Sequence, residues 1–136
     1  MTIKTQIITV IISGIVLLVL DYFYLNSAGT FFNNLVISIQ GSKIKIKIIG
    51  LILCYLTLIL GINYFIILNT DLNYPKKLMN SFLLGLLIYG VYEFTNYSIL
   101  NKWNFTAVVI DTTWGGFLFL LTTFITLGIV KKLKLK

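Results

Sequence analysis

The chain has 136 residues, of which 58% are hydrophobic and 11% are charged, and its mean hydropathy is +0.96. These values exclude an ordinary soluble globular domain and predict one integral membrane domain. The net charge of +7 comes from eleven lysines that flank the apolar segments, which is typical of membrane anchoring and not of nucleic-acid binding.

Hydropathy predicts four transmembrane helices, each long enough to cross a bilayer core of about 30 Å. In chain order they cover residues 5–25, 46–68, 78–100 and 105–130. The predicted fold class is therefore an all-α membrane protein, with residues 1–136 forming a single four-transmembrane-helix bundle. Pro75 suits the opening of the third helix, because the first turn has no backbone donor to lose.

A short amphipathic segment separates the first two predicted helices. Its apolar side chains follow near-helical spacing: Phe31, Phe32, Leu35, Val36 and Ile39. This pattern predicts a short interfacial helix over residues 30–39 that lies in the outer membrane surface, with a plain loop as the alternative.

The lysines indicate an orientation, because positively charged loops tend to stay in the cytoplasm. Seven lysines fall on the side of both termini and four on the opposite side. We therefore expect a multi-pass protein with both termini cytoplasmic, in a membrane of a cell, organelle or virion. The lysine-rich C-terminus is expected to contact anionic lipid heads of the bilayer.

Three of the four acidic residues fall inside apolar helices. Glu93 lies nine residues before Lys102 and Asp111 nine residues after it, so a hairpin places both carboxylates about 13 Å below the turn. Measured along the first helix, Asp21 lies roughly 25 Å from Lys4, so it is also expected in the outer half of the bilayer. The three acids are therefore predicted to share one level, whereas Asp71 falls in a loop.

Polar neighbours on the same helix faces make this level a candidate ligand or ion site. Tyr89 and Asn96 follow the spacing that places them on the face of Glu93, with Tyr92 alongside, and Trp114 lies three residues after Asp111. Gly115, next to Trp114, permits close approach of another helix or a ligand.

Carboxyl groups at this depth, with no lysine nearby, cannot all remain ionised. They are expected to share protons or to bind a cation through oxygen ligands, which suits Na⁺, Ca²⁺ or Mg²⁺; the identity of any metal is unknown. The structural alternative is that hydroxyls and amides of neighbouring helices satisfy them.

The missing residue types exclude several kinds of chemistry. The chain has no histidine and one cysteine, Cys54, so imidazole ligands, histidine catalysis and an intrachain disulfide are ruled out. No lysine lies where a retinal Schiff base would need one. We expect no cofactor such as haem or retinal, and we assign no catalytic residue.

Three short motifs resemble a family of small four-helix predicted membrane proteins that is catalogued as a domain of unknown function. They read Leu20-Asp21 near the end of the first helix, Tyr92-Glu93-Phe94-Thr95-Asn96 in the third and Asp111-Thr112-Thr113-Trp114-Gly115 in the fourth. Glu93 stands where the family usually has Asp. The resemblance covers most of the chain, implies the four-helix fold and adds Thr95 to the candidate site residues, but it implies no activity.

Three functions are compatible with these features. The first is binding or translocation of protons, cations or a small solute at the carboxylates, in a bundle that could form a homo-oligomer. The second is a structural or scaffold role in an organelle or virion membrane. The third is a lipid-modifying enzyme, which is disfavoured because no nucleophile or metal signature is present.

Overall fold

The computed structural model describes residues 1–135, in which every regular element is helical. The four helices are α1 (Ile3–Gln40), α2 (Ile48–Ile62), α3 (Tyr74–Ile99) and α4 (Phe105–Lys132), and a π-helical turn, η1 (Asn63–Ile67), continues α2. Each of the four spans, with η1 counted as part of α2, is long and apolar enough to cross a membrane. The predicted four-helix membrane fold is confirmed.

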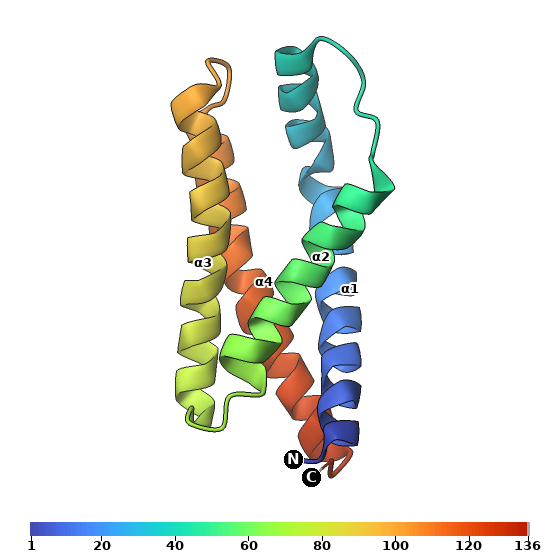
Figure 1. Ribbon diagram of the computed structural model, residues 1–136. Coiled ribbons are helices and arrows are strands. Elements are labelled where there is room, and N and C mark those ends of the chain that lie inside the picture. Colours follow the sequence, from blue (N-terminus) through green and yellow to red (C-terminus); the bar gives the residue numbers. More distant parts are fainter. Residues whose placement is uncertain (136) are drawn as a thin grey trace.

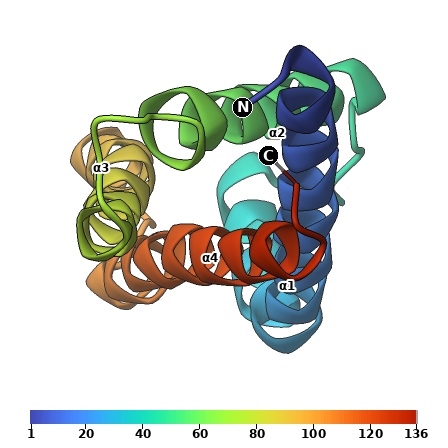
Figure 2. The ribbon, with the colours of Figure 1, turned by 90° about the horizontal axis from the view of Figure 1, so that it is seen from below.

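The helices run up and down, so that connections alternate between the two ends of the bundle. Both termini and the α2–α3 loop lie at one end, and the α3–α4 loop and the end of α1 lie at the other (Figure 1). Seen along the bundle, α1 and α3 occupy opposite sides, with α2 and α4 between them (Figure 2).

Side-chain caps explain where three of the helices begin. Thr2, Asn73 and Asn104 accept hydrogen bonds from backbone N–H groups three residues ahead, which satisfies donors that the first turn leaves free. Pro75 lies in the first turn of α3, as predicted. At the end of α1, Gly41 adopts a left-handed conformation with φ 74°, which ends the helix at low steric cost.

The predicted interfacial helix over residues 30–39 is wrong as a separate element. This segment is helical, but it is the last part of α1, whose 38 residues span about 57 Å at 1.5 Å per residue. Its apolar face packs on the α3–α4 hairpin instead of on lipid, with Leu35 in one buried cluster with Trp103, Ala107 and Val108. Packing against protein therefore replaces the predicted contact with the membrane surface.

A second cluster of buried apolar residues forms the middle of the bundle. It consists of Leu17, Leu58, Ile62, Ile67, Leu118 and Phe119. One helical turn farther along α1 and α4 from Leu17 and Leu118 stand Asp21 and Trp114. The acidic residues thus begin where this apolar core ends.

Candidate functional site

Glycines allow α3 and α4 to approach closely below the acidic residues. A Cβ atom added at Gly85 would lie 2.0 Å from the carbonyl oxygen of Gly115, and one added at Gly115 would lie 2.3 Å from Cγ of Tyr89. Neither position has room for a side chain. The contact fixes the two helices at a separation that holds Glu93 of α3 near Asp111 of α4.

Asp21 is almost completely buried and joins three helices. Its Oδ2 accepts a hydrogen bond from the Tyr55 hydroxyl of α2, and its Oδ1 accepts one from Nε1 of Trp114 in α4, at 2.9 Å. Each carboxylate oxygen therefore has a donor. These bonds offset the cost of burying a charged group.

Asp111 is held by an aromatic pair. Its Oδ1 accepts a 2.8 Å hydrogen bond from the Tyr24 hydroxyl, and the Tyr24 ring stacks on Trp114, with centroids 4.6 Å apart and planes 8° from parallel. Trp114 in turn donates to Asp21. The two aspartates are thus connected through one stacked pair of rings.

Glu93 is fully buried, with 0% of its surface exposed. Its Oε2 accepts a 2.7 Å hydrogen bond from Nε1 of Trp103, whereas Oε1 meets no donor within residues 1–135. The carboxyl groups of Glu93 and Asp111 lie within hydrogen-bonding reach of each other. Two facing carboxyl groups can form that bond only when one of them carries a proton.

An apolar groove of about 620 Å³ opens between α2 and α3 and reaches Asp111. We call it the α2–α3 groove. Five residues of α2, three of α3 and one of α4 line it: Gly50, Leu53, Cys54, Thr57, Leu58, Ile88, Tyr89, Tyr92 and Asp111. Within the described part of the chain, Asp111 is its only acidic lining residue.

The structure brings together most of the residues that the sequence predicted for one site. Asp21, Glu93 and Asp111 form what we call the carboxylate cluster, which Trp114 connects and Tyr89 approaches from α3. Tyr24 and Trp114 connect two of the three acids, and Glu93 lies beside Asp111; that all three share one membrane depth stays a prediction.

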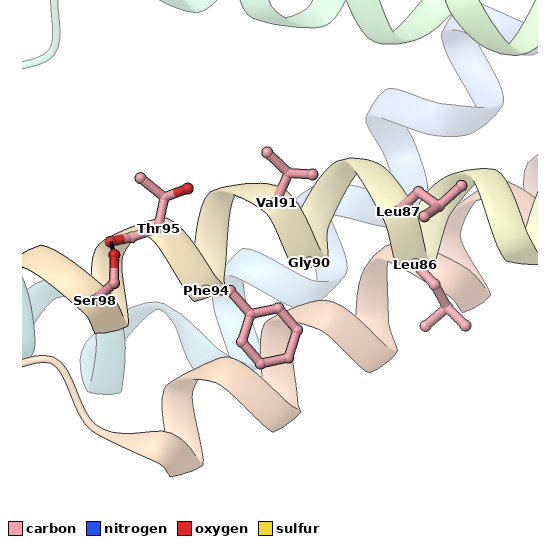
Figure 3. A pocket seen from close by; sticks show the side chains of 7 residues that line it. All are labelled: Leu86, Leu87, Gly90, Val91, Phe94, Thr95 and Ser98. Carbon is pink, nitrogen blue, oxygen red and sulfur yellow. Dashed lines mark hydrogen bonds between the residues drawn. The ribbon is translucent and has the colours of Figure 1, made fainter.

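The remaining predicted residues lie at the edge of the cluster or outside it. Tyr92 is largely exposed in the α2–α3 groove, packs edge-on against Trp103 and has Asn96 within hydrogen-bonding reach. Thr95 does not join the cluster: it lies in a shallow apolar hollow on the outer face of α3, where Ser98 donates to its carbonyl oxygen (Figure 3). Two residues after Glu93, Thr95 necessarily faces another side of the helix.

Three residues that donate to the carboxylates were not predicted as site residues. They are Tyr24, Tyr55 and Trp103. The sequence does contain a clue for Tyr24, because it follows Asp21 by three residues and so lies on the same face of the helix. The partnership of Tyr55 with Asp21 depends on how α2 crosses α1, which a single sequence does not reveal.

The hydrogen-bond donors around the carboxylate cluster argue against the predicted binding of a cation there. Indole N–H groups and tyrosine hydroxyls already occupy oxygens of all three carboxylates, and an indole N–H cannot ligate a metal. Within residues 1–135, no three His, Cys, Asp or Glu side chains lie close enough to hold one metal ion; in the carboxylate cluster, the stacked Tyr24 and Trp114 rings connect Asp21 to Asp111. The arrangement suits sharing of protons or hydrogen bonding to a solute better than coordination of a metal ion.

Comparison with known proteins shows to which family the chain belongs. No curated protein and no solved structure matches the chain. A family model described as predicted membrane protein (DUF2177) matches residues 6–128, which is most of the sequence. This chain belongs to that family of predicted membrane proteins of unknown function.

Proposed function

We propose that the protein binds a small solute inside the membrane, at Asp111, and that the solute enters through the α2–α3 groove. The supporting observation is the position of Asp111, a carboxylate that lines an apolar groove and lies beside Glu93, whose Oε1 lacks a donor. Pockets with apolar walls and few polar groups are typical of sites for small ligands.

The chemistry of the pair defines the kind of solute. If Oε1 of Glu93 carries a proton, this group can donate a hydrogen bond to Asp111, which gives the buried Oε1 a partner. Asp111 then carries the one negative charge of the Glu93–Asp111 pair, and because Tyr24 uses its Oδ1, Oδ2 can face a solute. The matching solute has an ammonium or another strong hydrogen-bond donor and an apolar body.

Intrinsic fluorescence can test this proposal, because both tryptophans of the chain donate to carboxylates of the cluster. Protein in zwitterionic nanodiscs would be titrated with dodecylammonium and with dodecanol, which has the same chain without the charge. We expect a saturable change with the amine and binding by the alcohol that is weaker by about tenfold or more, as charge-assisted hydrogen bonds predict.

Substitutions at the pair sharpen the test. Asp111→Asn should weaken amine binding about tenfold or more, whereas Glu93→Gln, which imitates a protonated Glu93, should retain it within a few fold. Asp71→Asn, an exposed loop variant, controls for net charge. Equal amine binding by Asp111→Asn and the unchanged protein would refute a site at Asp111.

A structural role is the second candidate, because the same hydrogen bonds cross between elements. Asp21 joins α1 to α2 and α4, and Asp111 joins α4 to α1. In this case, carboxylate variants would lower the stability of the bundle, and the amine and the alcohol would give the same fluorescence response. A difference between those two probes would favour the binding role.

A further inference from the structure

A second groove lies at the other end of the bundle, between the first turns of α3 and the last turns of α4. It has a volume of about 760 Å³. We call it the terminal groove, because it lies at the end of the bundle where both termini are found (Figure 1). It shares no lining residue with the α2–α3 groove.

Two lysines give the terminal groove a positive charge. Lys77 is half-buried, and its Nζ donates a 2.6 Å hydrogen bond to the carbonyl oxygen of Ile67, which limits the positions that this amine can take. Lys131 lines the groove from the last turn of α4, and Tyr74 adds a hydroxyl. Of the acidic residues, all of which are described, none lines the groove. Its charge therefore favours an anionic group.

The remainder of the terminal groove is apolar. Phe124, Leu127 and Gly128 of α4 contribute to its wall, on a helix that is apolar enough to span the membrane. A Cβ atom added at Gly128 would meet nothing within 4 Å, so the wall is open at that position. A ligand that fits has an anionic head and an apolar chain directed into the bilayer.

We propose that the terminal groove binds an anionic phospholipid, with its phosphate at Lys77 and Lys131 and an acyl chain along Phe124 and Gly128. Lysines near a membrane surface attract anionic headgroups, and here the groove gives the attraction a defined place. This localises the lipid contact expected of the lysine-rich C-terminus to the end of α4; Lys136 lies outside the described residues. The proposal is independent of the carboxylate cluster.

Native mass spectrometry of the full chain can count bound lipids. The protein in detergent would be titrated with phosphatidylglycerol and with phosphatidylcholine of identical acyl chains. We expect one tightly bound phosphatidylglycerol. The double substitution Lys77→Gln with Lys131→Gln should weaken that binding about 30-fold, or about fivefold for each lysine.

Neighbouring lysines provide a matched control. Lys76→Gln with Lys132→Gln removes the same charge from positions that do not line the terminal groove, and it should leave the bound lipid in place. Equal losses in the two double variants would overturn the proposal, because they would indicate diffuse attraction to the surface. Equal binding of the two lipids by the unchanged protein would also overturn it.

Two further variants keep the test decisive if the loss of Lys77 disturbs the fold. Lys131→Gln alone leaves the bond between Lys77 and Ile67 in place and should still weaken binding about fivefold. Gly128→Leu changes no charge but fills the open wall, and it should displace the acyl chain. Phosphatidylglycerol binding that is unaffected by Gly128→Leu would contradict occupation of the groove.

Discussion

Trp103 and Trp114 each donate an indole N–H to a buried carboxylate oxygen. A buried carboxylate that loses its donor retains the full cost of desolvation, so each indole contributes more than its apolar surface. Trp103 also anchors the α3–α4 turn to α1: its side chain is only 6% exposed and packs with Leu35. The same ring thus serves the carboxylate cluster and the packing of the hairpin.

Replacing Trp103 by Phe should show this dependence. The substitution keeps an aromatic ring but removes the donor to Oε2 of Glu93, and we expect a loss of about 1–3 kcal/mol in the free energy of unfolding. Denaturant titration in detergent micelles, followed by circular dichroism, would measure it.

A second background separates the hydrogen bond from packing. In protein that carries Glu93→Leu, Trp103→Phe removes no hydrogen bond to a carboxylate, so its cost should be smaller. The same loss in both backgrounds would show that the bond between Trp103 and Glu93 contributes nothing to stability.

At the level of the helices, a few contacts determine how the spans fit together. Gly85 and Gly115 allow α3 to approach α4, and η1 is fixed to α1 because Nδ2 of Asn63 donates a 2.6 Å hydrogen bond to Oγ of Ser13. Small residues and interhelical hydrogen bonds of this kind direct association in a membrane, where apolar surface alone distinguishes poorly between helices and lipid.

The glycine contact predicts a difference between two Gly→Ala variants. Gly85→Ala would place a Cβ 2.0 Å from a backbone oxygen, so α3 and α4 must separate, and overpacking of this kind costs about 1–3 kcal/mol. Gly61→Ala in α2 meets nothing within 4 Å and should stabilise the protein slightly, because Ala is the better helix former. Comparison of their unfolding midpoints tests the contact, and equal midpoints would contradict it.

The sequence predicted some of these features and missed others for physical reasons. Counting residues along a hairpin gave the level of Glu93 and Asp111, because rise per residue depends only on helix geometry. It could not assign Thr95 to the outer face or bring Tyr55 to Asp21, because rotation and crossing of helices follow from packing. The segment after Leu25 carried an amphipathic pattern, but a sequence pattern does not distinguish lipid from protein as the partner of an apolar face.

At the scale of the whole molecule, the main feature is that the two ends of the bundle carry different segments and different candidate sites. The end with both termini holds Lys4, the α2–α3 loop and the end of α4, and the other end holds Lys102 and the segment after α1 (Figure 1). The carboxylate cluster lies toward the second end, while the terminal groove lies at the first.

The distribution of lysines predicts that both termini face the cytoplasm, since positively charged loops are retained there. In protein with Cys54→Ala, Asp71→Cys would mark the α2–α3 loop and Asn101→Cys the α3–α4 loop, both at exposed positions. In intact cells, an impermeant maleimide should label Asn101→Cys alone, and permeabilised cells should show both. Labelling of Asp71→Cys alone would reverse the orientation and would place the terminal groove in the opposite leaflet. The expected pattern places that groove in the cytoplasmic leaflet, where anionic lipids are enriched, and leaves the carboxylate cluster nearer the outer surface.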